Sequence, residues 1–122
     1  MDGNRLLVVD DDPESRSIVS EALVDQGYTI SIAMNQDEAS QAIAEDRPSL
    51  VLLYIGRSGT DTHEVVRQMR ERARDLSILV LGGGPAARVA AERIGAVGYV
   101  ADPLDLGALV RSVEEACPFV HA

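Results

Sequence analysis

The chain has 122 residues, a length that suits one compact domain and leaves too little core for two. Hydrophobic residues make up 46% and charged residues 25%, so the composition excludes collagen-like, low-complexity and strongly disordered chains. Acidic residues number 20 against 11 basic ones, which are all arginine, and the formal net charge is −9. A surface this acidic disfavours binding to nucleic acid or to anionic membranes, so the sequence favours a protein partner.

Cysteine usage and hydropathy indicate where the domain works. The single cysteine, Cys117, excludes an internal disulfide, and the first residues lack the basic and then apolar pattern of an export signal. No apolar run approaches the roughly 18 residues that a membrane-spanning helix needs. We therefore expect a soluble, cytoplasmic single domain over 1–122, with a loose tail at 118–122.

Short apolar runs alternate with segments of helical periodicity along the whole chain. This alternation predicts an α/β fold in which helices cover both faces of a parallel sheet. The first and third runs are continuously apolar, as expected for strands in the middle of such a sheet. The five predicted strands lie near 5–10, 28–33, 50–55, 78–81 and 97–100.

The starts and ends of the helices are predicted from capping residues, proline and glycine. Pro85 is expected to begin the fourth helix, because proline at the first helical position leaves no N–H group unpaired. Gly27 and Gly95 are expected to end the first and fourth helices, and the last helix is expected over 105–116. Side chains that can cap helix N-termini are Asp12, Asn35, Asp61 and Asp105.

The ends of the predicted strands carry the chemistry that the sequence offers, because ligands of open parallel sheets bind beyond the carboxyl ends of the strands. Clustered carboxylates raise one another's pKa unless a cation neutralises them, and their oxygen atoms suit a hard cation such as Mg²⁺. The alternative is that Asp12 only caps a helix while Asp10 and Asp11 are solvated loop charges. The pattern leaves both interpretations open. The strand-end residues are Asp10, Asp11 and Asp12, then Tyr54, Gly82 and Asp102.

Three stretches match a known family at consistent offsets. They are the acidic run from Val8 to Pro13, the loop from Ile55 to Asp61, and the Gly and Tyr residues before the acid-proline pair at 102–103. On these stretches the chain resembles the receiver domain of two-component response regulators, over essentially its whole length. The resemblance implies a flavodoxin-like (βα)5 three-layer sandwich with a five-stranded parallel sheet of order 2-1-3-4-5.

Three residues depart from the active site that the resemblance implies. The family's phosphate-accepting Asp matches Tyr54, its Ser or Thr that hydrogen-bonds the phosphoryl group matches Gly82, and its Lys matches Asp102. A phenol is not a carboxylate nucleophile, glycine has no side-chain donor, and an aspartate repels a phosphoryl group. We therefore expect a degenerate receiver, or pseudo-receiver, that works without phosphorylation.

The magnesium site that the resemblance implies is incomplete in this chain. Asp11 and the carbonyl of Gly56 match its ligands, but Tyr54 supplies no anionic ligand, so we expect no cofactor and only doubtful Mg²⁺ binding. Arg57 follows the loop carbonyl, and our hypothesis is that it pairs with Asp10 or Asp11 in place of the ion. The alternative is that Arg57 is a solvated loop residue.

The resemblance also places an expected partner surface, which runs from Ala86 to Ile94, through Tyr99, to the outer face of the helix 105–116. Arg88, Arg93 and Arg111 are expected to pair with acidic groups across the contact, and tyrosine is favoured at such contacts. The alternative for Tyr99 is a half-buried residue that covers a sheet edge.

These features lead to three hypotheses about function. The favoured one is a non-enzymatic domain that binds a second copy of itself or a signalling partner, because no nucleophile and base are arranged for catalysis. The second is a sensor of a small ligand or cation that uses the acidic crevice and the glycines at 82–84. The third is a conventional phospho-receiver that uses another acid, such as Asp11 or Asp61.

Overall fold

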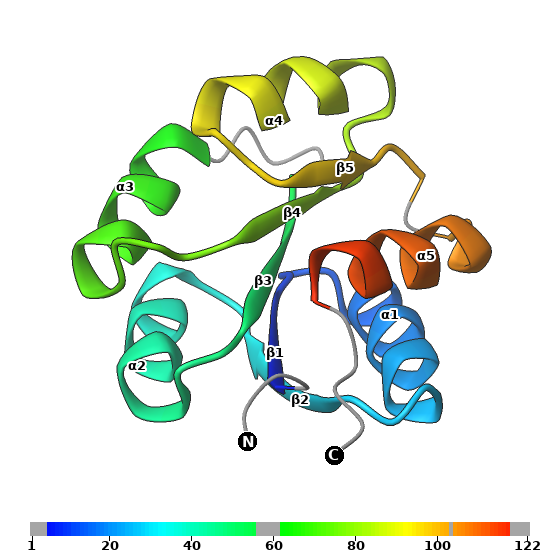
Figure 1. Ribbon diagram of the computed structural model, residues 1–122, viewed down its shortest axis with the longest axis horizontal. Coiled ribbons are helices and arrows are strands. Elements are labelled where there is room, and N and C mark those ends of the chain that lie inside the picture. Colours follow the sequence, from blue (N-terminus) through cyan, green and yellow to red (C-terminus); the bar gives the residue numbers. More distant parts are fainter. Residues whose placement is uncertain (1–4, 56–61, 103, 118–122) are drawn as a thin grey trace.

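The computed structural model describes residues 5–55, 62–102 and 104–117. In them, strands and helices alternate along the chain and the strands form one sheet, in the order β2-β1-β3-β4-β5. All strand pairs are parallel, which confirms the predicted (βα)5 topology. Helices α1 and α5 cover one face of this sheet, and α2, α3 and α4 cover the other (Figure 1).

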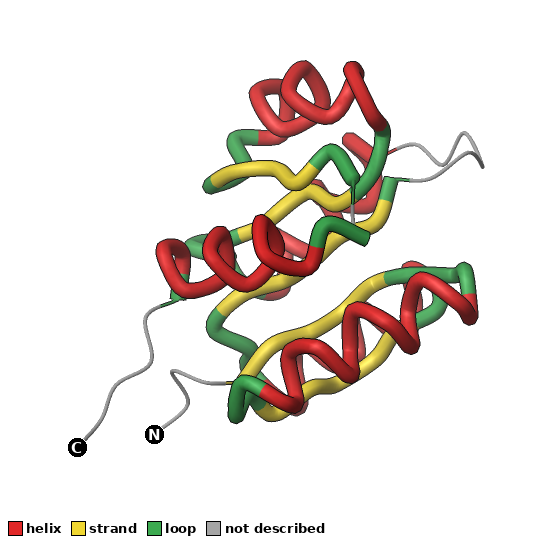
Figure 2. Tube along the Cα trace, turned by 90° about the vertical axis from the view of Figure 1, so that its right-hand side faces the viewer, coloured by secondary structure: helices red, strands yellow, loops and turns green. Residues whose placement is uncertain are grey.

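The strands are β1 (Arg5–Val9), β2 (Thr29–Ala33), β3 (Leu50–Tyr54), β4 (Ile78–Leu81) and β5 (Gly98–Val100). The helices are α1 (Pro13–Asp25), α2 (Gln36–Asp46), α3 (Thr62–Arg72), α4 (Ala87–Ile94) and α5 (Leu106–Ala116). A short 3₁₀ turn, η1 (Gly84–Ala86), precedes α4. Figure 2 shows α1 and α5 in front of the strands, as one outer layer of the three-layer sandwich.

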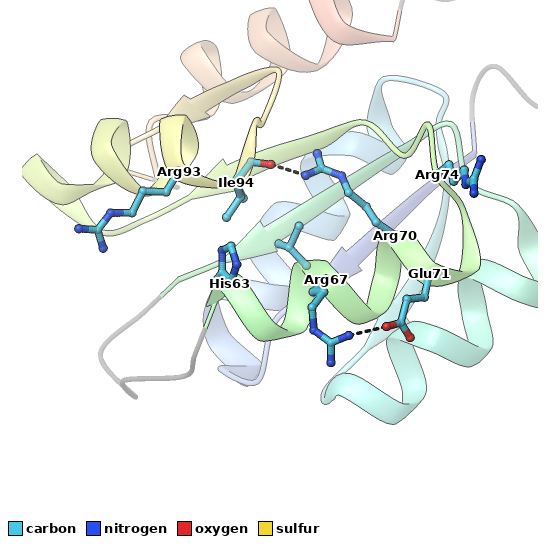
Figure 3. Close-up of a pocket in the computed structure, with 8 residues that line it drawn as sticks. His63, Arg67, Arg70, Glu71, Arg74, Arg93 and Ile94 are labelled. Carbon is cyan, nitrogen blue, oxygen red and sulfur yellow. Dashed lines mark hydrogen bonds and ion pairs between the residues drawn. The ribbon is translucent and has the colours of Figure 1, made fainter.

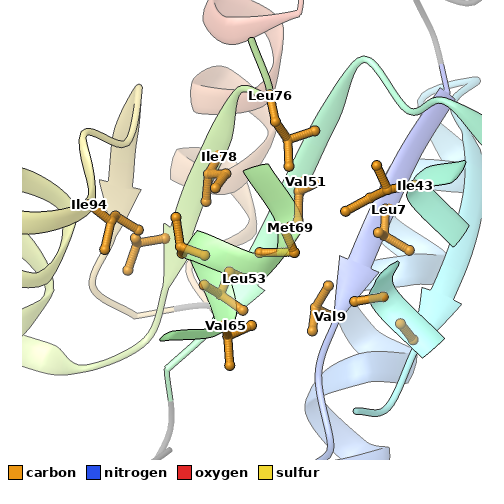
Figure 4. Packing of buried hydrophobic residues seen from close by; sticks show 14 of the residues in the cluster. Leu7, Val9, Ile43, Val51, Leu53, Val65, Met69, Leu76, Ile78 and Ile94 are labelled. Atoms are coloured by element: carbon orange, nitrogen blue, oxygen red, sulfur yellow. The ribbon is translucent and has the colours of Figure 1, made fainter. Parts of the chain in front are cut away.

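Two hydrophobic clusters hold the layers together, one on each face of the sheet. Side chains alternate along a strand, so Leu7 and Val9 face α2 and α3 while Leu6 and Val8 face α1 and α5. Figure 4 shows the first cluster, in which Met69 of α3 packs among the central strands. The residues of β1, β3 and β4 are buried on both faces, which explains their continuously apolar sequences.

Strand boundaries differ from the predictions by single residues. Ile55 and Val97 lie outside the ladder but still donate to it, from Ile55 N to Leu81 O at 2.9 Å and from Val97 N to Ile78 O at 2.8 Å. Tyr28 precedes β2 because its N–H closes the preceding turn onto the carbonyl of Leu23 at 3.1 Å. Asp10 likewise follows β1 rather than ending it.

Side-chain caps begin three of the helices as predicted. Asp12 accepts from the N–H of Glu14 at 3.0 Å, Asn35 from that of Glu38 at 2.9 Å, and Asp105 from that of Ala108 at 3.1 Å. The predicted cap Asp61 lies outside the described residues.

The prediction that Pro85 is a first helical residue is confirmed in part, because Pro85 lies in the first turn of η1, which leads directly into α4. Gly83 and Gly84 have positive φ angles of 87° and 51°, and Ala86 N donates to Gly83 O at 3.0 Å, so this stretch forms η1 and not the first turn of α4. The α-helix starts only at Ala87. None of the helices within the described ranges has the length and apolar character that crossing a bilayer requires.

Candidate functional site

The sheet register brings the predicted strand-end residues to one edge. Val9 pairs with Leu53, and the final residue of β3, Tyr54, pairs with Leu81. Gly82 directly follows β4, and the acidic pair Asp10 and Asp11 directly follows β1. Because parallel strands end at the same side, these residues form the candidate site at the carboxyl edge of the sheet.

Asp10 is the buried acid of this site. Its side chain is only 2% exposed, and Oδ1 accepts a hydrogen bond from the N–H of Asp12 at 2.9 Å. Oδ2 is buried and has no hydrogen-bond partner among the described residues. Burial raises the pKa of Asp10, an effect that the N–H of Asp12 and the Ser15 hydroxyl partly oppose.

The alternative interpretation was that Asp12 only caps a helix and that Asp10 and Asp11 are solvated loop charges. It is right for Asp11 and Asp12 and wrong for Asp10. Asp11 is exposed and Asp12 caps α1, but Asp10 is not a solvated loop charge. Ser15 was missed from sequence, although it is buried beside Asp10. No pattern around Ser15 signals this burial, because it depends on how α1 packs against the strand end.

The ring of Tyr54 fills the space beside Gly82 in which a side chain at position 82 would lie. A Cβ atom on Gly82 would lie 2.9 Å from Cε1 and 3.2 Å from Cδ1 of the Tyr54 ring, closer than real Cβ contacts allow. Gly82 also has a φ angle of +79°, a conformation that strains other residues. The half-buried tyrosine ring thus fills the room that a serine or threonine side chain at position 82 would need.

The glycine loop after β4 is tied to β5. Gly82 N donates to Val100 O at 2.9 Å, and Gly84 N donates to Ala101 O at 3.3 Å. Gly83 has a φ angle of +87°, and a Cβ there would lie 2.7 Å from Cδ1 of Ile55. Because two of the three N–H groups already have partners, the loop does not present the convergent donors of an anion cradle.

Asp102 is bonded within its own loop. Its Oδ1 accepts from Leu104 N at 3.0 Å, and its carbonyl accepts from Asp105 N at 3.0 Å. The side chain is exposed and helps to close the turn that leads into α5.

The described residues do not by themselves complete a magnesium site. Nowhere in 5–55, 62–102 or 104–117 do three His, Cys, Asp or Glu side chains gather as metal ligands. Asp10 already uses one oxygen, and Tyr54 adds no carboxylate. Gly56 and Arg57 lie outside the described residues, so the predicted carbonyl ligand and the predicted arginine pairing stay predictions.

The predicted partner residues all lie on the surface of α4, β5 and α5. Tyr99 is 44% exposed on the edge strand β5, a position that suits both a contact residue and a half-buried residue that covers the sheet edge. Arg88 and Arg111 are exposed, but Arg88 already pairs with Glu92 of the same helix at 3.1 Å. Sequence reasoning missed three exposed apolar residues on or beside these elements, Val89, Leu104 and Leu106.

Comparison with known proteins agrees with this architecture. Residues 6–114 match the response regulator receiver domain family. The chain is 39% identical over 108 residues to the response regulator MprA of Mycolicibacterium vanbaalenii, a match that covers 87% of this chain and 47% of that protein. The chain thus spans about half the length of the curated relatives that it matches.

Two solved structures show the same fold. The signal receiver domain of a response regulator from Bermanella marisrubri is 28% identical with a TM-score of 0.81, and the match covers 93% of this chain and 97% of that one. The response regulator TrrA from Thermotoga maritima, solved in complex with Mg²⁺ and BeF, is 30% identical with a TM-score of 0.79, covering 93% and 98%. A five-stranded parallel sheet with an acidic strand end defines a receiver-like class, and this chain belongs to the response regulator receiver domain family.

Proposed function

We propose that this chain is a degenerate receiver domain, which transmits a signal through protein contacts without phosphorylation at the strand end. The observation that carries the proposal is the Tyr54 ring, which lies where a side chain at position 82 would stand. A phosphoryl group needs an accepting carboxylate and a hydroxyl donor beside it. Here Tyr54 stands at the expected carboxylate position, and its ring fills the space of a hydroxyl side chain at position 82.

The other strand-end residues support the same proposal. The carboxylate of Asp102 is hydrogen-bonded to Leu104 within its own loop, and as an anion it repels a phosphoryl group. Asp10 is buried, one of its oxygens has no partner among the described residues, and its negative charge would disfavour a phosphoryl dianion nearby. The proposed domain therefore has no catalytic group and needs no cofactor.

A spectroscopic titration tests this proposal. Backbone amide NMR spectra are recorded without additions, then with Mg²⁺, then with Mg²⁺ and beryllofluoride, using TrrA as a positive control because it was solved with both. We expect no saturable shift changes at Tyr54, Gly82 or Tyr99. Saturable changes at those three positions would show a pocket that still switches, and the proposal would be wrong.

The proposed contact surface is the face of α4, β5 and α5, where a homodimer partner or a signalling protein would bind. Exposed apolar side chains gather here beside arginines, a combination enriched at protein interfaces. They are Val89, Tyr99, Leu104 and Leu106, between Arg88 and Arg111.

Analytical ultracentrifugation tests the homodimer form of this contact. Tyr99→Ser is expected to weaken self-association at least tenfold, roughly the loss of one interface hot spot. The matched control is Ile32→Ser, because Ile32 is 47% exposed on β2 at the opposite edge of the sheet. Equal effects of the two substitutions would contradict the assignment of the surface.

A further inference from the structure

A groove between α3 and α4 collects positive charge in this acidic protein (Figure 3). It has a volume of about 560 Å³, and four of its lining residues are arginines. The whole chain has 11 basic residues and a net charge of −9, so this one groove holds more than a third of its cations. We call it the arginine groove, and its arginines are Arg67, Arg70, Arg74 and Arg93.

Arg70 is held rigidly across the groove. Its guanidinium donates to the carbonyl oxygens of Ile94 and Gly95, the second at 3.2 Å, and so ties α3 to the end of α4. These acceptors are carbonyls at a helix C-terminus, where a cation is favourable. Among the described residues no carboxylate pairs with Arg70, so its charge is oriented but not neutralised by a counter-charge.

Of the other three arginines in the groove, one has carboxylate partners and two do not. Arg67 pairs with Glu64 and Glu71 at 2.5 Å each. Arg74 and Arg93 have no ion-pair partner within the described part of the chain. In Figure 3, Arg93 lies at the α4 side and Arg74 at the far end of α3, with Arg70 between them.

This spacing decides which kind of anion fits. A small anion such as phosphate is bound by donors that converge, whereas these guanidinium groups are spread along the groove. The apolar residues Val66 and Ile94 also line it. A nucleic acid would meet the negative charge of the rest of the molecule. An extended acidic chain can place separate carboxylates on separate arginines and an apolar side chain between them.

We propose that the arginine groove binds an acidic peptide segment of a partner protein, with carboxylates on Arg74 and Arg93. Guanidinium groups suit this role because their planar fork matches a carboxylate. The groove borders the face of α4, β5 and α5, because Arg93 and Ile94 belong to α4, and it does not depend on whether the strand end accepts a phosphoryl group.

Titration with a model peptide tests the groove. The probe is a synthetic peptide of about eight residues in which pairs of glutamates alternate with leucine, and the readout is the amide NMR spectrum of the folded chain. We expect saturable shift changes confined to α3 and α4, and an apparent Kd that rises at least tenfold when NaCl is raised from about 0.02 to about 0.3 M.

Matched variants locate the binding site. Arg74→Gln with Arg93→Gln is expected to weaken peptide binding at least tenfold. Arg5→Gln with Arg16→Gln removes the same charge outside both the groove and the proposed contact surface and is expected to change binding less than about threefold. A spectrum with native dispersion shows that each variant is folded.

Three outcomes would overturn the proposal. The first is equal binding of a peptide with glutamine in place of glutamate, and the second is equal loss in both double variants. The third is tighter binding of pyrophosphate or of a short DNA duplex at the groove than of the acidic peptide, which would assign the groove to that ligand instead.

Discussion

Tyr54 and Gly82 depend on each other at the end of the central strands. The tyrosine ring needs a neighbour without a side chain, and the glycine needs a conformation in which other residues are strained. Two separate costs therefore oppose a side chain at position 82, one from the ring and one from the backbone.

Alanine substitutions separate these two costs. Gly84→Ala meets nothing within 4 Å at a φ angle of +51°, so it should lose only the backbone cost, about 1–2 kcal/mol. Gly82→Ala also meets the Tyr54 ring at 2.9 Å, and we expect a total loss of about 2–4 kcal/mol. Urea denaturation measures the loss of unfolding free energy in both variants. In a Tyr54→Ala background, Gly82→Ala should cost no more than Gly84→Ala does, because the ring is gone. Equal losses for the two glycines would show that the ring moves aside freely.

The buried carboxyl of Asp10 predicts a pH dependence. Its pKa is raised in the folded state, so the folded protein holds this proton to higher pH than the unfolded chain does. The contribution of Asp10 to stability is therefore greatest below the ordinary aspartate pKa of about 3.9, and it falls as the pH rises through the raised value.

Asp10→Asn keeps the acceptor for Asp12 and removes the buried charge. We expect it to stabilise the domain at pH 7 by on the order of 1 kcal/mol, the cost of one unpaired buried polar group, and to give little gain near pH 3. The exposed Asp11→Asn is the control and should change stability by less than about 0.5 kcal/mol at either pH. A loss at pH 7 from Asp10→Asn would refute the assignment of a raised pKa.

At the scale of helices and strands, local signals were the reliable ones. Asp12, Asn35 and Asp105 were predicted as caps because a cap involves a side chain and a backbone N–H only two or three residues away. The 3₁₀ turn before α4 was not predicted, since the sequence shows that Gly83 and Gly84 can take positive φ angles but not that they do.

The sequence predicted which residues lie at the candidate site, because strand topology determines that, but it did not predict how their side chains pack. The strands are parallel and their carboxyl ends therefore lie at one edge, so Tyr54, Gly82 and the acidic pair were correctly expected there. The packing of the tyrosine ring on Gly82, and the burial of Ser15 beside Asp10, depend on side-chain directions in three dimensions. No pattern in the sequence carries that information.

The capping box of α2 allows a clean test of element stability. Asn35 accepts from Glu38 N at 2.9 Å, and Glu38 accepts from Met34 N at 2.9 Å. Asn35→Ala should cost about 1 kcal/mol of unfolding free energy, whereas Asn35→Asp keeps the capping oxygen and should stay within about 0.3 kcal/mol. Chemical denaturation of the three proteins measures the difference, and an equal loss in both variants would exclude the cap as its source.

For the whole molecule, the net charge of −9 opposes folding through self-repulsion. The ion pairs on α3 and α4 are exposed and offset little of it. The charge is also uneven, because the arginine groove is positive while the molecule as a whole is negative.

Salt therefore should stabilise this domain, and the choice of salt tests the metal site. We expect the Tm to rise by a few degrees when NaCl is raised from about 0.02 to about 0.3 M, because screening reduces the repulsion. MgCl₂ at equal ionic strength should give the same rise. An additional rise with MgCl₂ that Asp11→Asn abolishes would reveal a bound ion, because a ligand of the folded state adds to stability.

The contact between Tyr54 and Gly82 also has a meaning for evolution. A chain that gained serine at 82 while it kept Tyr54 would suffer both the ring clash and the backbone strain, and one that gained aspartate at 54 first would leave the ring's space unfilled. Neither single step leads to a better protein than the starting one. Because each single change is expected to cost stability, we expect positions 54 and 82 to change together among relatives of this chain.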